Sequence, residues 1–221
     1  MLEFGDTYFV LDASGTRVFC GIHQGDRWEA SFYSDAEALE AIFSGAEAVG
    51  FRDYFERGRL AGLICCNGPG SILGIRLALM ACAGWRSLPG LRAAPVLSYQ
   101  SLHAAAALLL EAGTAAPDLF SVISEFRKGR WNRLDVRAGV PIGPIYLDNL
   151  ESIGALSHPV FSLRQRHRAA PPPANARAME YDPGIDGRWL HRIPLQRWER
   201  APEVYVAEEP TFVKWTPDRH R

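Results

Sequence analysis

The chain has 221 residues, of which 48% are hydrophobic, and a formal net charge of −1. This length and composition are those of a globular protein that can bury a core, as one domain or as two small subdomains. The near-zero charge excludes nucleic-acid binding driven by an overall basic field, so any RNA contact would be local or shared with a partner.

Neither the cysteines nor the apolar runs point to export or to a membrane. The four cysteines have no Cys-x-x-Cys spacing and lie in apolar runs, which predicts reduced thiols in the core. The apolar run after the acidic first residues is too short for a secretory signal, and no stretch reaches membrane-spanning length. We therefore expect a cytoplasmic protein that makes no membrane contact.

The first half of the chain predicts three strands, a helix, and then two strand–helix pairs. The predicted bounds are 7–11, 17–23 and 28–33 for the strands of an antiparallel meander, 60–66 and 95–98 for the later strands, and 71–85 and 100–112 for the later helices. Ser34 or Asp35 is the predicted N-cap of the first helix, which is expected to extend toward Phe55.

The second half has a weaker pattern. Residues 119–123 and 129–136 predict two further strands. The basic residues 164–168 and the prolines 171–173 predict an exposed loop followed by a stiff linker, with no core element.

Two features near the C-terminus are interpreted as surface. Arginines and tryptophans alternate over 188–200, a pattern that can contact RNA by base stacking and phosphate pairing. We interpret it instead as a surface stripe where arginines pack on tryptophans. Short extended pieces are expected around 204–206 and 211–213.

The most informative feature is the turn that follows the strand over 60–66. Gly68 and Gly70 can take backbone angles closed to other residues, and Ser71 is the predicted N-cap of the next helix. A helix start presents free N–H groups to an anion. The residues of this possible anion-binding turn are Asp12, Gly68, Gly70, Ser71 and Arg76.

Two common phosphate-binding motifs fit this turn poorly. A Walker-type loop is excluded because Ile75 and Arg76, rather than lysine and a hydroxyl residue, follow Gly74. A dinucleotide fingerprint would need one residue fewer before Gly74 and a carboxylate after the next strand, and it is therefore weak.

Small residues recur along the predicted helix over 71–85. Gly74, Ala78 and Cys82 are four apart and Ala81 lies beside them, a spacing that lets a second helix approach closely. Because the helix is apolar nearly all round, it is covered either by its own domain or by a partner subunit, and both remain open. The predicted interface consists of Gly74, Leu77, Ala78, Ala81 and Cys82, with Leu39 and Phe43 from the helix that begins near Asp35.

The sequence shows no catalytic constellation. Its six histidines are scattered, none four residues from another, so we predict no metal site. Ser71 does not lie in a Gly-x-Ser-x-Gly elbow. We expect neither intrinsic catalysis nor a bound cofactor.

Two motifs give the chain a resemblance to a known family. Gly68-Pro69-Gly70-Ser71, followed by Gly74 and Arg76, matches a strand–turn–helix motif Gly-Pro-Gly-Ser-Phe-Thr-Gly-Val/Leu-Arg, and residues 11–14 match a first strand that ends in Asp-Thr-Ser. On these residues the chain resembles the TsaB (YeaZ) family, the dimerisation subunit of the bacterial machinery that makes threonylcarbamoyladenosine in tRNA.

The resemblance is weaker elsewhere. Residues 125–131 and 210–214 only echo family motifs. Ile72 and Leu73 replace the Phe and Thr of the turn motif, and the family's histidine is not evident near Ser34. The chain is therefore similar to a divergent member.

The resemblance implies the actin-like ATPase, ribonuclease-H-like fold, an α/β fold of two small subdomains in which helices flank mixed sheets. We assign residues 1–107 to an N-terminal subdomain and 108–221 to a C-terminal one with a Pro/Arg-rich loop at 164–178. The implied function is that of a non-catalytic subunit, which pairs with the threonylcarbamoyl transferase subunit or with itself and touches tRNA only indirectly.

Two alternatives stay open. In actin-like ATPases an aspartate at the end of the first strand holds the water shell of magnesium, so Asp12 and the turn over 68–71 could face ATP in a phosphotransferase. We favour an ordinary hairpin turn for Asp12, because aspartate, serine and glycine are the residues expected there. The second alternative is a degenerate family member with an unrelated binding role.

Overall fold

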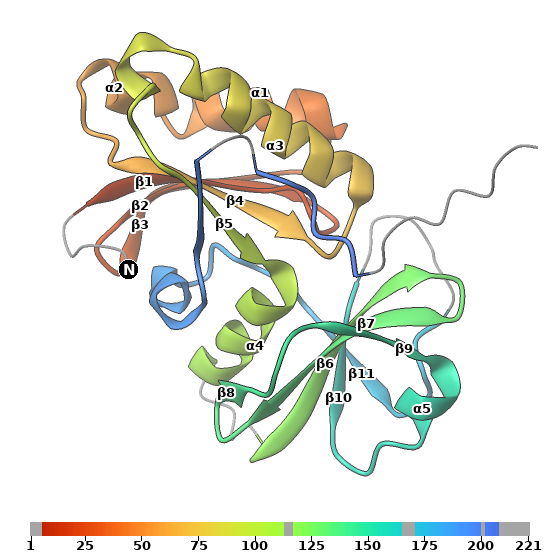
Figure 1. Cartoon of the computed structure of the whole chain (residues 1–221). Coiled ribbons are helices and arrows are strands. Elements are labelled where there is room, and N and C mark those ends of the chain that lie inside the picture. The colour runs from red at the N-terminus through yellow and green to blue at the C-terminus, as the bar shows by residue number, and fades with distance from the viewer. Residues whose placement is uncertain (1–5, 113–116, 165–170, 200–201, 208–221) are drawn as a thin grey trace, which may run out of the picture.

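The computed structural model describes residues 6–112, 117–164, 171–199 and 202–207, and Figure 1 shows them arranged around two sheets. Among these residues each sheet has six strands. Three of the sequence-based expectations lie outside the described residues: most of the basic loop at 164–168, the extended piece at 211–213, and the family echo at 210–214.

The first sheet follows the predicted order of elements. Its strands are β1 (Thr7–Asp12), β2 (Val18–Gln24), β3 (Arg27–Ser34), β4 (Gly62–Gly68), β5 (Val96–Gln100) and β12 (Gln196–Trp198). They are ordered β12-β5-β4-β1-β2-β3, with β1, β4 and β5 parallel and the others antiparallel to their neighbours. The predicted meander is therefore confirmed, and β1 lies in the middle of the sheet, buried along its length.

Helices cover both faces of the first sheet (Figure 1). One face packs against α1 (Ala38–Ala48), α2 (Phe51–Glu56) and α3 (Ile72–Arg86), with the short η1 (Pro89–Leu91) beyond them. The other face packs against α4 (Ser101–Glu111) and η2 (Gly187–Arg192). Alternate residues of β1 pack into the hydrophobic cores on the two faces of the sheet. Phe9 and Leu11 face α3, while Tyr8 and Val10 face α4 and η2.

The first helix begins later and ends sooner than predicted. Its N-cap is Glu37, which makes no side-chain cap, whereas the Ser34 hydroxyl accepts a hydrogen bond from the Ala36 N–H at 3.1 Å in the preceding turn. Gly50 takes a φ of +71°, so the chain turns there and restarts as α2 instead of continuing as one helix.

The second sheet contains more strands than the sequence predicts. It consists of β6 (Leu119–Arg127), β7 (Arg130–Arg137), β8 (Val140–Pro141), β9 (Tyr146–Asn149), β10 (Val160–Leu163) and β11 (Ala176–Met179), with α5 (Leu150–Gly154) after β9. Only β6 and β7 are predicted strands. The strands β10 and β11 have four residues each, too few to show a period in the sequence.

The helix α4 is shared by the two sheets. Its residues Ala104 and Ala107 belong to the core against the first sheet, while Leu102, Ala105 and Ala106 pack with β6 and β7 of the second. The proposed subdomain boundary after residue 107 therefore falls inside α4, and β12 from the C-terminal half completes the first sheet.

The predicted arginine–tryptophan surface stripe is wrong for its first tryptophan. Trp189 is fully buried, meets the Tyr99 ring edge-on at 5.1 Å, and donates its indole N–H to the Pro183 carbonyl at 2.8 Å. Trp198 donates its indole N–H to the Ser98 hydroxyl at 2.6 Å. These tryptophans attach the C-terminal region to the first sheet, so they are not free to bind RNA.

The cysteines agree with the sequence-based expectation. Cys20, Cys65, Cys66 and Cys82 are free and buried, which confirms the predicted core thiols. Burial raises the pKa of the Cys20 and Cys66 thiols, so they stay protonated at neutral pH.

Within the described ranges, no helix has the length and apolar character needed to cross a bilayer.

Because α3 lies close to the turn after β1, alanine substitutions at two glycines of that helix are expected to change the free energy of unfolding in opposite directions. Gly74→Ala is expected to lower the free energy of unfolding by about 1–3 kcal/mol, because its Cβ would lie 2.3 Å from the Ala13 carbonyl oxygen. Gly84→Ala is the matched control: no other segment lies within 4 Å of its Cβ, and alanine favours a helix by about 1 kcal/mol. Urea unfolding followed by circular dichroism measures both, and equal effects would contradict the tight contact.

Candidate functional site

The glycine turn after β4 is held against the turn after β1. Gly68 takes a φ of +115°, as predicted for a glycine. Gly70 is needed for another reason: a Cβ there would lie 2.3 Å from the Ser14 carbonyl oxygen, which accepts the Ser71 N–H at 2.9 Å. Ser71 is the N-cap of α3, as predicted, and its hydroxyl accepts the Gly74 N–H at 3.4 Å.

Asp12, at the end of β1, is buried beneath this turn. Its Oδ1 accepts the Ser14 N–H at 2.7 Å and the Ser14 hydroxyl at 2.6 Å. Its Oδ2 accepts the Tyr99 hydroxyl at 2.7 Å and the Tyr181 hydroxyl at 2.6 Å. Burial, and then the charge of Asp12, raise the pKa of both tyrosines well above 10, so both remain donors.

These four donors leave the Asp12 carboxylate little capacity for other ligands. A carboxylate offers about four acceptor positions, and protein groups fill that number here. The residue is 1% exposed, so the water shell of a metal ion has no direct access to it. In this arrangement Asp12 closes a hairpin turn and links β1 to β5 and to the segment after β11.

The small-residue stripe on α3 faces the protein's own core. Ala78 and Cys82 are fully buried in the same cluster as Ala41 and Ile42 of α1, and Gly74 contacts the Ala13 backbone. The expectation that a second subunit packs on Gly74, Ala78 and Cys82 is therefore corrected: the closely approaching backbone belongs to this chain. Leu77 and Ala81 are only partly buried.

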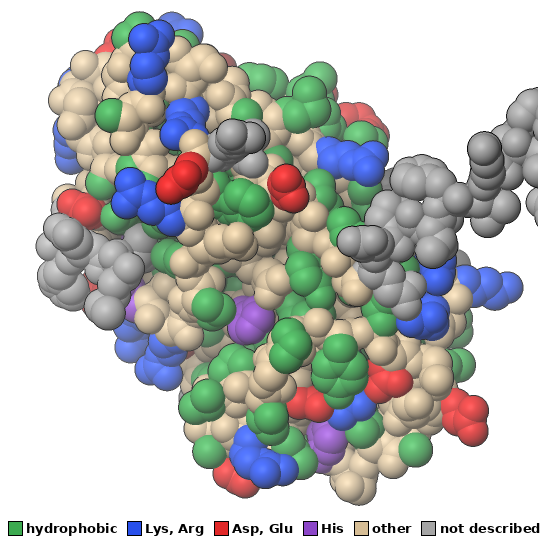
Figure 2. All heavy atoms as spheres, viewed as in Figure 1, with side chains coloured by type: hydrophobic (Ala, Val, Ile, Leu, Met, Phe, Trp, Pro, Cys, Tyr) green, Lys and Arg blue, Asp and Glu red, His purple; other side chains and the backbone are tan. Residues whose placement is uncertain are grey.

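Large apolar side chains remain exposed on the outer side of the same helices. On α1, Leu39 is 54% and Phe43 is 51% exposed, and on α3, Leu73 is 65% and Met80 is 70% exposed. Figure 2 shows hydrophobic side chains at the surface over these two helices. We call Leu39, Phe43, Leu73, Leu77 and Met80 the α1–α3 face. Two of its members, Leu39 and Phe43, are among the predicted interface residues, as is the partly buried Leu77.

The α1–α3 face rests on a rigid aromatic base. The Phe43 ring meets Trp85 edge-on, with 5.9 Å between ring centroids. Trp85 in turn contacts Phe9 at 5.3 Å and Phe51 at 4.9 Å, and both of those rings are buried. Because Phe43 is supported from below, little side-chain entropy would be lost when a partner covers it.

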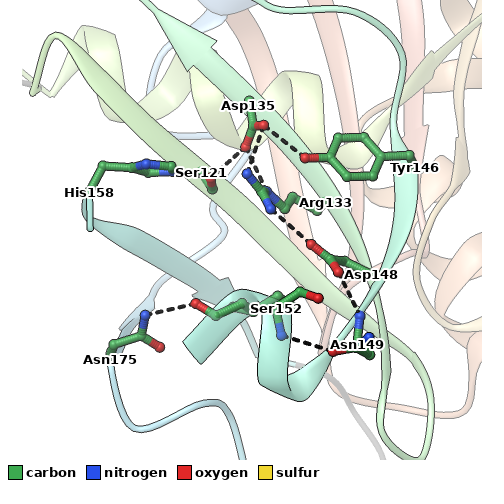
Figure 3. A network of polar contacts seen from close by, with 10 residues as sticks. Ser121, Arg133, Asp135, Tyr146, Asp148, Asn149, Ser152, His158 and Asn175 are labelled. Atoms are coloured by element: carbon green, nitrogen blue, oxygen red, sulfur yellow. Dashed lines mark hydrogen bonds and ion pairs between the residues drawn. The ribbon is translucent and has the colours of Figure 1, made fainter. Parts of the chain in front are cut away.

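A second polar cluster, which the sequence spacing does not reveal, lies on the second sheet (Figure 3). The Ser121 hydroxyl donates to Asp135 at 2.5 Å and lies 2.7 Å from His158 Nε2. Arg133 binds Asp135 through two nitrogens at 2.7 and 2.9 Å and bridges to Asp148 at 2.8 Å. Although burial raises the pKa of Asp135, hydrogen bonds from Arg133, Ser121 and Tyr146 hold it below its usual value.

This cluster contains a serine, a histidine and an aspartate, but its hydrogen bonds are not arranged as in a catalytic triad. In a triad the histidine accepts the serine proton and the aspartate orients the histidine. Here the serine proton goes to Asp135, and Ser121 is fully buried. The cluster therefore ties β6, β7 and the segment before β10 together.

The described residues contain no group of three or more His, Cys, Asp or Glu side chains placed to hold a metal ion. One histidine pair is close: the rings of His23 and His191 are 5.6 Å apart. Each ring contacts a backbone carbonyl, that of Gly187 and that of Gly25 respectively. The pair attaches η2 to the β2–β3 turn.

The fold is that of YeaZ. YeaZ from Pseudomonas aeruginosa superposes with a TM-score of 0.59 at 17% identity, over 80% of this chain and 85% of that one. A second solved structure, of a protein from Pseudomonas aeruginosa described as similar to the peptidase YeaZ, gives 0.56 at 17% identity over the same shares. No family model and no curated protein matches the sequence. The structural likeness confirms the predicted fold class.

Removing the hydroxyl of Tyr99, which binds the buried Asp12, is expected to destabilise the protein more than removing the hydroxyl of the exposed Tyr146. Tyr99→Phe is expected to lower the free energy of unfolding by about 1.5–3 kcal/mol, since it takes a buried donor from a charged acceptor. Tyr146→Phe is the control, because Tyr146 is exposed and Asp135 keeps Arg133 and Ser121 as donors. Chemical denaturation compares the two variants. If Tyr99→Phe costs no more than Tyr146→Phe, the cluster does not hold Asp12 as described.

Proposed function

We propose that this protein is a YeaZ-like partner subunit in the formation of threonylcarbamoyladenosine in tRNA. It acts in the cytoplasm by binding the transferase subunit, or a second copy of itself, through the α1–α3 face. The observation that carries the proposal is the gathering of large exposed apolar side chains on two neighbouring helices. Contiguous apolar surface of this kind marks sites of protein–protein interaction.

The composition of the α1–α3 face supports a protein partner. Leu39, Phe43 and Glu47 follow one another at intervals of four on α1, and all three are exposed. On α3, Arg76 lies between Leu73 and Met80 at helical spacing and is also exposed. An apolar centre with an acidic residue on one helix and a basic residue on the other suits a partner that presents two helices of the same kind.

The Asp12 cluster favours this role over that of a phosphotransferase. In the phosphotransferase alternative, Asp12 would hold the water shell of magnesium. Its oxygens instead accept hydrogen bonds from Ser14, Tyr99 and Tyr181. Freeing the carboxylate would break several buried hydrogen bonds, each costing about 1.5–3 kcal/mol when the acceptor is charged.

A charge placed at the centre of the α1–α3 face tests the proposal. Met80→Asp is expected to weaken self-association or binding to the threonylcarbamoyl transferase subunit by about 30-fold, the effect of losing a contact worth about 2 kcal/mol. Its own fold is expected to persist because Met80 is 70% exposed. Light scattering after size exclusion measures the complex, and copurification with the transferase subunit measures the partner role.

Ile185→Asp provides the matched control. Ile185 is 75% exposed and lies before η2, so it tests the general effect of a new surface carboxylate. A complex that survives Met80→Asp unchanged would show that the surface is misassigned. Failure of the unaltered protein to bind either the transferase subunit or itself would overturn the partner role.

A further inference from the structure

A pocket of about 370 Å³ lies where the first sheet meets the second. Three segments far apart in the sequence form its walls: the start of α3, the β6–β7 hairpin, and residues 204–207. Figure 1 shows the last of these segments passing from the end of β4 toward the second sheet. The pocket is separate from the buried Asp12 cluster and lies beyond the role proposed for the α1–α3 face.

One wall of the pocket supplies positive charge and N–H donors. Gly70, Ile72 and Arg76 line it, at the N-terminus of a helix of 15 residues. The Ser71 hydroxyl accepts a hydrogen bond from the Gly74 N–H. The N–H groups of Ile72 and Leu73 have no acceptor within the helix, because they lie in its first turn. Arg76 is exposed and has no ion-pair partner among the residues that the structure describes.

The facing wall holds a buried acceptor that receives no donor from the part of the chain that the structure describes. Asn132 lines the pocket, is 2% exposed, and its Oδ1 has no hydrogen-bond partner among the described residues. Its Nδ2 makes a long hydrogen bond of 3.4 Å to the Ser124 hydroxyl. A buried amide oxygen without a donor costs about 1–3 kcal/mol, so its retention needs a reason other than stability.

Glu125, which neighbours Ser124 on β6, also lines the pocket. Glu125 pairs with Trp131, and Ser124 pairs with Asn132, so consecutive positions on β6 and β7 face opposite sides of the sheet. The Glu125 side chain therefore points to the side of Trp131, away from Asn132. Glu125 is thus also a lining residue of the pocket, but the register directs its carboxylate to the face opposite that of the Asn132 amide.

The third wall is fixed by contacts to both sheets. The Tyr205 N–H donates to the Asn67 carbonyl at 2.8 Å, and Asn67 Nδ2 donates to the Glu203 carbonyl at 3.3 Å. The Tyr205 hydroxyl donates to the Ile145 carbonyl, in the loop before β9, at 3.0 Å. These hydrogen bonds hold the segment across the two halves of the fold, so the pocket has a defined shape.

We infer that this pocket binds a small anion, a carboxylate or a phosphate, that also carries a hydroxyl or amino group. The anionic group lies at the start of α3 beside Arg76, where N–H dipoles and the guanidinium stabilise negative charge. The hydroxyl or amino group donates to Asn132 Oδ1. Ile75 and Val204 provide the apolar part of the wall.

Calorimetric titration of the full-length protein tests the inference with two probes. D-glycerate offers a carboxylate with hydroxyl groups, and glycerol 3-phosphate offers a phosphate with the same. At least one is expected to bind with a Kd below about 1 mM, and the one that binds identifies the anionic group. Glycerol, which has the hydroxyl groups without the charge, is expected not to bind.

Two variants and a control decide whether the binding is at this pocket. Arg76→Ala and Asn132→Leu are each expected to weaken binding at least about tenfold, which corresponds to about 1.4 kcal/mol. Arg92→Ala, at another exposed arginine, is expected to leave binding unchanged. Asn132→Leu should also leave the urea midpoint unchanged or raise it, because it removes an unsatisfied buried oxygen.

Three results would overturn the inference: binding of neither probe, binding that survives both variants, or a large fall in the urea midpoint of Asn132→Leu. The last result would mean that the amide serves stability. Asn132 is not part of the α1–α3 face, so Asn132→Leu should not affect partner binding. Failure of this inference is thereby distinguishable from failure of the proposed function.

Discussion

The contact between the start of α3 and the turn after β1 is the constraint on which the rest of the molecule depends. Two backbone carbonyls, of Ala13 and Ser14, approach Gly74 and Gly70 so closely that any side chain there would collide with them. The Ser71 N–H donates to one of these carbonyls and fixes the register of the contact. The helix axis, the depth of Asp12 and the position of the glycine turn all follow from this approach.

The same contact decides which side of α3 is left for a partner. Because the small residues face inward, α3 lies close to β1 and α1, and its larger residues Leu73 and Met80 are directed outward. The outer side is thus an apolar surface on a firm base, supported by Trp85 beneath Phe43. A rigid surface of this kind loses little entropy when it is covered, which supports the partner role that we propose for it.

The two halves of the fold are joined by polar contacts that converge near the glycine turn. Tyr181 reaches Asp12 from the segment after β11, and Tyr205 reaches both Asn67 and Ile145. The pocket with the unsatisfied Asn132 oxygen lies beside these contacts. Its acceptor lies on one wall of the pocket and the start of α3, with its free N–H donors, lies on the other, so the two walls differ in polarity.

Features with a strong local signal could be predicted from the sequence. The strand over 17–23 and the Ser71 cap each depend on residues within a few positions of one another, and the structure confirms both. The first helix was mispredicted at its ends, because Ser34 forms a turn with Ala36 and Gly50 breaks the chain. The short strands β10 and β11 gave no readable period, since each forms by pairing with a distant strand.

The sequence by itself determined the three-strand meander and the strand–helix pairs of the first sheet, the glycine turn and the cap of α3, because periodicity and capping are local properties. The fold class followed from the family resemblance that the turn motif carries. Tertiary structure alone decided which side of α3 is free, that Trp189 belongs to the core, and that Tyr99 and Tyr181 enclose Asp12. Those outcomes depend on burial and on hydrogen bonds between residues as much as 169 positions apart, and no local pattern encodes them.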